Sequence, residues 1–180
     1  MKVQLLYFSW YNIFNMRKVI IVSLCVLASS FTFVQFAAAA DLTTSQKAAI
    51  VEACPTTQST LRRISSSDTT ARINRGRDYD QILKLFYAMN TRVASNNITE
   101  PKLTDLTKKF EEALNNFRNN FNRYNDYLRS TYEVDCKNHA NTFYDNLTKT
   151  RNSRVVINAD ITVLDKIIND YQKAVEELVK

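Results

Sequence analysis

The stretch LTDLTKKFEEALNNFRNNFNRYNDYLRSTYEVD, residues 103–135, decides the fold of this chain. Apolar side chains recur in it at intervals of three and four residues, which places them on one face of an α-helix. The members of this face are Leu103, Phe110, Leu114, Phe117, Phe121, Tyr124 and Leu128. The pattern predicts one long helix that packs in a bundle against partners with a similar face.

Two other segments carry a similar face. Residues 143–180 present Leu147, Thr150, Arg154, Ile157, Ile161, Leu164, Ile168, Tyr171, Val175 and Leu178. Upstream, the same spacing joins Leu61, Ser65, Asp68, Arg72, Arg75, Tyr79, Ile82, Phe86, Met89 and Val93. Each segment is therefore predicted to be helical.

The upstream segment allows two interpretations. Its register continues through the polar residues 65–80, which is consistent with a single helix from Pro55 to Ser95. Pro55 suits the first turn of a helix, where no backbone N–H is needed. The alternative breaks the helix at residues 65–67 and uses Asp68 as the N-cap of a new helix. Periodicity alone does not choose between them.

Residues that form turns are scarce. Gly76 is the only glycine, and Pro55 and Pro101 are the only prolines. Turns that need a positive φ angle are therefore rare, and no hairpin sequence favours β-strands. We expect an all-α fold.

Two cysteines, Cys54 and Cys136, select between the two topologies if they are joined, because a disulfide requires Cα atoms within about 7 Å. An unbroken helix up to Ser95 brings them to the same end of the bundle, whereas a broken helix leaves roughly 18 Å or more between them. The sequence thus predicts one disulfide in an elongated antiparallel three-helix, coiled-coil-like bundle. Thr44–Ala53 would form a short leading helix at the disulfide end.

Residues 1–40 have the pattern of an N-terminal extension followed by a signal peptide. Arg17 and Lys18 form a positive n-region, and residues 19–36 are mostly apolar. Ala37–Ala40 supply the small residues that signal peptidase needs.

Cleavage near Ala40 would leave residues 41–180 as a single helical-bundle domain, secreted or extracytoplasmic at the cell surface. An oxidising compartment of this kind agrees with a disulfide. The alternative is an uncleaved leader that anchors the chain in a membrane. Met16 would be a more ordinary start than Met1.

The charge of the segment after the leader is mild. Lys2, Arg17 and Lys18 lie in the leader, so the net charge falls from +6 for the whole chain to +3. Charges of both signs are interspersed, as on a solvated helical surface. We expect no nucleic-acid partner.

Sequence patterns that carry catalysis are missing. The chain has no Gly-rich phosphate loop, no His-Glu metal pattern and no nucleophile with a candidate histidine base. His139 is the only histidine and is predicted to lie in a turn, so a metal site with two cysteine thiols lacks ligands. We expect a protein that is not an enzyme and uses no metal or cofactor.

The run Arg72-Ile73-Asn74-Arg75-Gly76-Arg77-Asp78-Tyr79 is the most unusual local feature. Charged residues occupy positions of an otherwise apolar face, and Asp68 and Arg154 fall at similar heights on different helices. One interpretation is a polar core layer that fixes the register of the helices. The other is an anion-binding site formed by Asp68, Arg72, Arg75, Arg77 and Arg154, with Gly76 allowing close approach. A hinge at Gly76 is a third interpretation.

Several short motifs occur together in the chain. They are the Ala-rich end of the leader, Cys54, Asn74-Arg75-Gly76-Arg77-x-Tyr79, Arg92-Val93-Ala94-x-Asn96, Asp135-Cys136 and Phe143-Tyr144. With these motifs, most of Thr44 to Lys180 resembles the uncharacterised small secreted helical proteins of candidate-phyla bacteria. The resemblance implies an extracytoplasmic helical protein of unknown activity, with no catalytic residue to carry over. Pro55 departs from the pattern, in which a small polar residue is expected after the cysteine.

Two functions are compatible with these features. The first is an exported, non-enzymatic structural or interaction protein whose partner is an envelope or cell-surface component. The second is an extracytoplasmic carrier or chaperone that opens its bundle around apolar or unfolded clients. The apolar faces would also allow self-association, because such faces pair between chains as well as within one.

Overall fold

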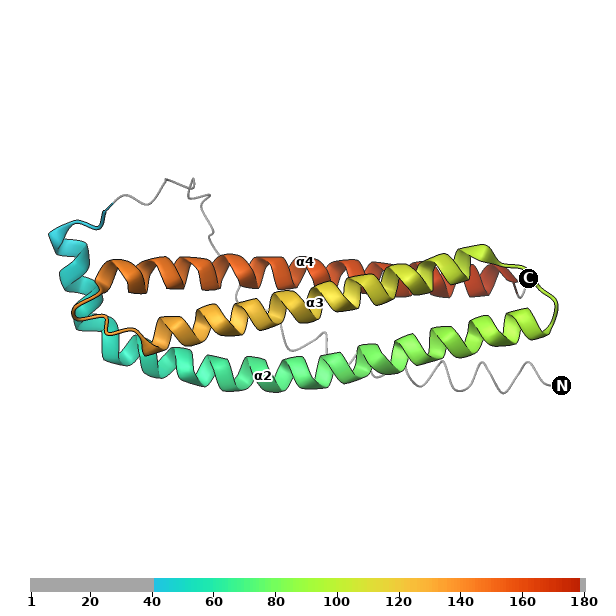
Figure 1. The fold of residues 1–180 in the computed structure, drawn as a ribbon, viewed down its shortest axis with the longest axis horizontal. Helices are drawn as coiled ribbons and strands as arrows, with labels where there is room; N and C mark the ends of the chain where they lie inside the picture. Colours follow the sequence, from blue (N-terminus) through green and yellow to red (C-terminus); the bar gives the residue numbers. More distant parts are fainter. Residues whose placement is uncertain (1–40, 179–180) are drawn as a thin grey trace. The chain divides into compact units, whose positions relative to one another are not determined.

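The computed structural model describes residues 41–178, which form three helices and no strand. They are α2 (Thr44–Ser95), α3 (Pro101–Glu133) and α4 (Ala140–Leu178). The helices lie side by side and alternate in direction (Figure 1), so the predicted antiparallel three-helix bundle is confirmed. The predicted extension, start codon, signal peptide and cleavage site fall in residues 1–40, outside the described residues.

Helix α2 is continuous over 52 residues, so the alternative break at residues 65–67 does not occur. It begins at a capping box, in which Thr43 and Gln46 exchange hydrogen bonds between side chain and backbone.

Pro55 lies inside α2 rather than in its first turn, and the leading helix predicted for Thr44–Ala53 is the first part of α2. The boundary predicted at Pro55 was therefore wrong. A proline removes one backbone hydrogen bond and its ring presses on the preceding turn, which bends a helix as readily as it ends one. In Figure 1 the first turns of α2 are inclined to the rest of the helix.

Hydrogen bonds near both ends of α2 fix its direction relative to α3. Gln58 donates to the backbone carbonyl of Val134 at 2.7 Å, and Asn90 donates to the hydroxyl of Thr107 at 2.9 Å. Residue numbers rise along α2 as they fall along α3, so the two helices are antiparallel.

Two contacts show the direction of α4 relative to α3. The hydroxyls of Thr131 and Thr150, both buried, lie 3.1 Å apart. At the other end Lys102 pairs with Glu177 at 3.1 Å. The helices are therefore antiparallel along their whole shared length.

The predicted apolar face of α3 forms the centre of the core, and all seven of its members are buried. Two aromatic rings of α2 pack onto it edge to face: Tyr79 meets Phe110 and Phe117, and Phe86 meets Phe110. Phe86 also stacks on Tyr171 of α4, with ring centroids 3.7 Å apart. The other two faces contribute Leu61, Tyr79, Phe86, Thr150, Ile157, Leu164, Ile168 and Tyr171 as buried residues.

The disulfide predicted between Cys54 and Cys136 is present, with Cα atoms 6.2 Å apart. Both cysteines are buried in the core. Asp135 shapes the turn that carries Cys136, because its carboxylate accepts hydrogen bonds from the backbone of Lys137 and the side chain of Asn138. The bond from Asn138 is the largest of the effects that lower the pKa of Asp135.

Helix α3 packs closely against both neighbours, whereas α2 and α4 approach each other at few places. Large side chains bridge the wider gap, as in the stack of Phe86 on Tyr171. Among the described helices, none combines the length and apolar character needed to cross a membrane.

The disulfide closes a large loop, since its cysteines are 82 residues apart in the sequence. Restriction of the unfolded chain predicts that the double variant C54A/C136A loses about 4 kcal/mol of unfolding free energy. The measurement is chemical unfolding of the purified protein, compared with wild type that has been reduced. An unchanged midpoint in both samples would contradict the predicted role of the disulfide.

Candidate functional site

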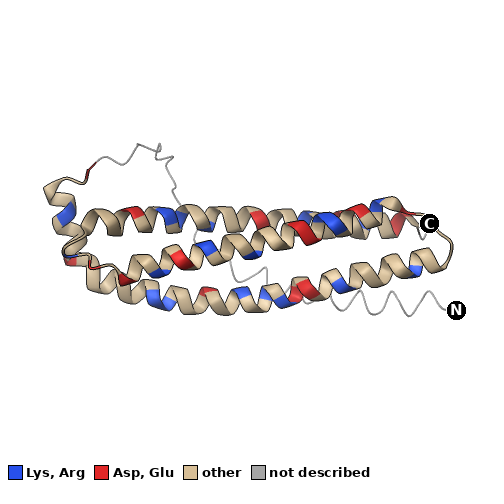
Figure 2. Cartoon of the chain, in the orientation of Figure 1, with Lys and Arg blue, Asp and Glu red and all other residues tan. Residues whose placement is uncertain are grey.

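Charged side chains are distributed over all three helices, with both signs interspersed (Figure 2). Several join neighbouring helices, including the pair of Arg118 on α3 with Asp80 on α2. Exposed pairs of this kind contribute at most about 1 kcal/mol each to stability. The surface therefore resembles the solvated helical surface that the sequence predicts.

Asp68 lies where the three helices meet. Its carboxylate accepts a hydrogen bond from the hydroxyl of Tyr124 on α3 and lies 3.4 Å from the guanidinium of Arg154 on α4. The side chain of Asp68 is 19% exposed and that of Arg154 is 55% exposed, so the pair extends from the core to the surface. The prediction that Asp68 and Arg154 lie at similar heights is confirmed.

Burial and the hydrogen bond to Asp68 both raise the pKa of Tyr124, and burial has the larger effect. The tyrosine is 1% exposed, so its hydroxyl depends on Asp68 as its acceptor. We call Asp68, Tyr124 and Arg154 the lower polar layer.

Arg72 lies one turn further along α2 and contacts α3. It donates to the side-chain oxygen of Asn122 at 2.9 Å, and its guanidinium carbon lies 5.6 Å from the ring centroid of Phe121. Its Nε is buried without a hydrogen-bond partner among the described residues. Arg72 therefore serves chiefly to join α2 to α3.

Arg75 and Arg77 are exposed and do not join this layer. Arg75 was expected on the buried face of α2, but α2 approaches α4 at few places and the side chain of Arg75 is exposed. Gly76 lies in uninterrupted helix, and a Cβ atom added to it would meet nothing within 4 Å. Of the five predicted residues, Asp68 and Arg154 therefore form an ion pair, Arg72 lies beside them, and Arg75 and Arg77 are exposed. Anion binding by these residues stays a prediction.

A second set of polar side chains connects all three helices near the other end of the bundle. Asn90 on α2 donates to Thr107 on α3 at 2.9 Å and accepts from the hydroxyl of Tyr171 on α4 at 2.8 Å. The same tyrosine hydroxyl also lies 3.1 Å from the backbone carbonyl of Phe86. We call Asn90, Thr107 and Tyr171 the upper polar layer.

The hydrogen bond that Thr107 donates shows which groups donate and which accept in the upper polar layer. The Thr107 hydroxyl donates to the carbonyl of Leu103 at 2.9 Å, so it must accept from Asn90. This arrangement turns the amide nitrogen of Asn90 toward α3 and its oxygen toward Tyr171. Burial raises the pKa of Tyr171 to about 12.

The sequence interpretation placed Asp68 and Arg154 in a polar layer and Tyr124 and Tyr171 on buried faces. It did not join Tyr124 to that layer, and it did not find the upper polar layer. A buried tyrosine hydroxyl needs a hydrogen-bond partner, so the buried tyrosines were the feature of the sequence that could have indicated these layers. Asn90 lies one residue after Met89 of the apolar face, and nothing in the spacing shows which helix its amide meets.

Within the described residues, no three Asp, Glu, His or Cys side chains gather as a metal site would require. The side chains that converge are instead joined to one another by hydrogen bonds. The chain matches no protein-family model, no curated protein and no solved structure. Its function must therefore be inferred from its own residues.

The lower polar layer predicts unequal effects of its members on stability. D68A leaves the buried hydroxyl of Tyr124 without an acceptor and should cost about 2 kcal/mol of unfolding free energy. R154A should cost less than about 1 kcal/mol because Arg154 is half exposed. D78A, at an exposed position of α2, is the control. Equal losses for D68A and R154A in chemical unfolding would contradict this assignment.

The upper polar layer predicts a pH-dependent effect of Y171F. At pH 7 the variant should lose about 1–2 kcal/mol, because Asn90 loses its donor. The folded-state pKa of Tyr171 is raised above its unfolded value of 10.0, so its contribution is present below pH 10 and is lost toward pH 12. The difference from wild type should shrink over that interval.

The control for Y171F is Y144F, because Tyr144 is 45% exposed and its hydroxyl is not part of either polar layer. Unfolding free energies of wild type and both variants, measured from pH 7 to pH 12, test the prediction. A difference between wild type and Y171F that grows with pH would refute the role of Tyr171.

Proposed function

We propose that this chain is an exported, non-enzymatic interaction protein that binds an envelope or cell-surface component through an exposed face of its bundle. The observation that supports this proposal most strongly is a set of aliphatic side chains on the surface of α4. Val156 is 45% exposed and Val163 is 49% exposed, although each could have been polar without cost to the core.

Val156 and Val163 are seven residues apart, which places them on one flank of the helix two turns from each other. Asp160 lies between them and accepts a hydrogen bond from Asn120 at 2.8 Å, so this flank borders α3. Ile167, half-buried, continues the flank by one more turn. We call Val156, Val163 and Ile167 the α4 stripe. Exposed apolar residues that line up in this way favour a contact with another molecule.

The scaffold under the α4 stripe supports this proposal. The disulfide and the two polar layers tie the three helices together at different heights. A surface that is held in place loses little conformational freedom on binding, which favours affinity. A disulfide also suits the oxidising environment of an exported protein.

Sedimentation of the purified protein with envelopes of the producing cell tests the proposal. Wild type should bind saturably, and V156K/V163K should lose at least about tenfold in affinity, since two charges replace the apolar contact. V155K is the matched control, because Val155 is 68% exposed but lies on another side of α4. Both variants should unfold like wild type.

Absence of saturable binding by the wild type would overturn the proposed function. Equal binding by the double variant and V155K would remove the α4 stripe from the contact. A change in the unfolding midpoint of V156K/V163K would show that the bundle, rather than its surface, had been altered.

A carrier or chaperone for apolar clients is the second candidate, and a separate observation favours it. Because α2 and α4 approach each other at few places, α2 could separate from α4 more readily than from α3. Leu85 on α2 is 42% exposed, and Ile82 and Met89 are only half-buried. Suppressed aggregation of a denatured client, without binding to envelopes, would favour this candidate over the first.

A further inference from the structure

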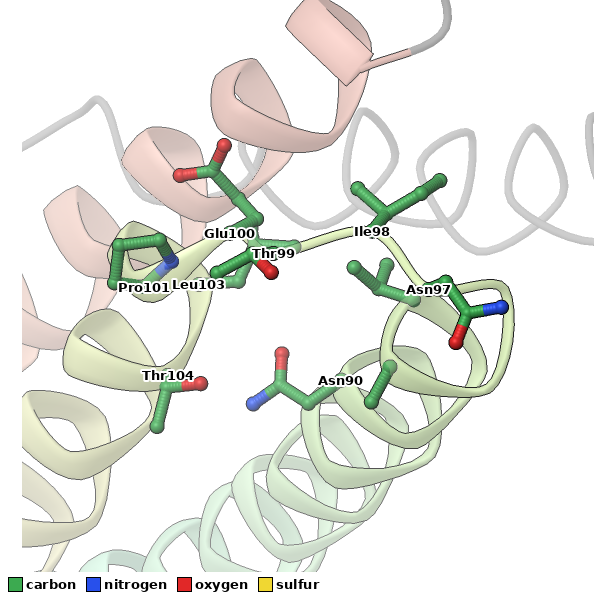
Figure 3. A pocket seen from close by; sticks show the side chains of 10 residues that line it. Asn90, Asn97, Ile98, Thr99, Glu100, Pro101, Leu103 and Thr104 are labelled. Carbon is green, nitrogen blue, oxygen red and sulfur yellow. The ribbon is translucent and has the colours of Figure 1, made fainter.

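A depression of about 450 Å³ opens where α2 turns into α3. Its size falls within the range of small-molecule sites. The last turns of α2, the loop 96–100 and the first turn of α3 line it (Figure 3). Asn97 in this loop adopts a positive φ of 57°, which lets the chain curve around the depression before Pro101 starts α3.

The side-chain amide of Asn90 points into the depression, with the hydroxyls of Thr99 and Thr104 on its walls (Figure 3). The amide belongs to the upper polar layer, so its orientation is fixed by Thr107 on one side and Tyr171 on the other. A polar group held in this way needs little reorganisation to bind a ligand.

The amide of Asn90 retains unused bonding capacity. A carboxamide offers two N–H donors and an oxygen with two acceptor positions. Among the described residues, one donor is used by Thr107 and the oxygen accepts from Tyr171. One N–H and one lone pair therefore remain for a group that both accepts and donates.

The charges around the depression indicate a neutral ligand. No lysine or arginine is among the described residues that line it, which disfavours an anion. Its only acidic residue, Glu100, accepts from the backbone N–H of Lys102 at 3.3 Å and points away from Asn90 in Figure 3. Apolar walls from Val93 and Pro101 complete the site.

We propose that this depression binds a neutral sugar ring. Sugar hydroxyls both donate and accept, which suits the remaining donor and acceptor position of the Asn90 amide. The hydroxyls of Thr99 and Thr104 extend the polar contacts, and the apolar walls face the C–H groups of the ring. The sugar site does not include the α4 stripe, so it stands apart from the proposed envelope contact.

The test is an NMR titration of the purified, isotope-labelled protein with glucose, galactose and N-acetylglucosamine, and with glucose 6-phosphate as an anionic counterpart. At least one neutral sugar should shift the side-chain amide signals of Asn90 and the backbone signals of residues 98–100 saturably. Glucose 6-phosphate should bind more weakly than glucose.

T104V removes one hydroxyl at nearly constant volume and leaves the upper polar layer untouched, so it should weaken sugar binding about tenfold. T162V, at an exposed threonine of α4 far along the chain, is the matched control and should bind as wild type does. V156K/V163K should also bind the sugar normally, which separates this site from the proposed envelope contact.

Three results would overturn the sugar site. One is the absence of saturable shifts with all three neutral sugars. Another is a set of shifts that maps away from Asn90 and residues 98–100. The third is equal affinity of wild type and T104V for the sugar that binds.

Discussion

The link between Cys54 and Cys136 is the constraint on which the rest of the bundle depends. It joins the N-terminal part of α2 to the turn between α3 and α4, and both cysteines are buried there. Once this end is fixed, an unbroken α2 has to run alongside α3 in a single register. The pairing of Asn90 with Thr107, more than thirty residues further along α2, is consistent with that register.

The two polar layers add specificity that apolar packing does not provide. Apolar side chains tolerate a shift of one helix past another, whereas a buried hydroxyl is satisfied only at one height and one rotation. Tyr124 finds Asp68, and Tyr171 finds Asn90, each across a helix boundary. The layers also place polar groups near the surface, where Arg154 reaches solvent and Asn90 faces the depression.

Much of the fold could be predicted from the sequence, because the spacing of apolar residues reports helical faces directly. The face from Leu103 to Leu128 is buried throughout, and the requirement that Cys54 meet Cys136 selected the unbroken α2. Pro55 misled the prediction because the capping box of Thr43 and Gln46 starts the helix earlier, and a proline inside a helix can bend it without ending it. The gap between α2 and α4 is a property of the assembled bundle, so the exposure of Arg75 was not readable from its position.

The candidate sites were less predictable for a physical reason. Spacing along one helix shows which residues share a face, but the partner of a polar side chain depends on the rotation of the neighbouring helix. Asp68 and Arg154 were placed at one height, whereas the contribution of Tyr124 required the assembled structure. The depression beside Asn90 depends likewise on the path of the loop 96–100.

Peptide mapping by mass spectrometry of the non-reduced protein, taken from the producing cell, is the measurement that shows whether Cys54 is joined to Cys136. We expect a cross-linked peptide that contains Cys54 and Cys136 and that separates on reduction. Free thiols at both positions, or a different pairing, would contradict the constraint that fixes the register of the bundle.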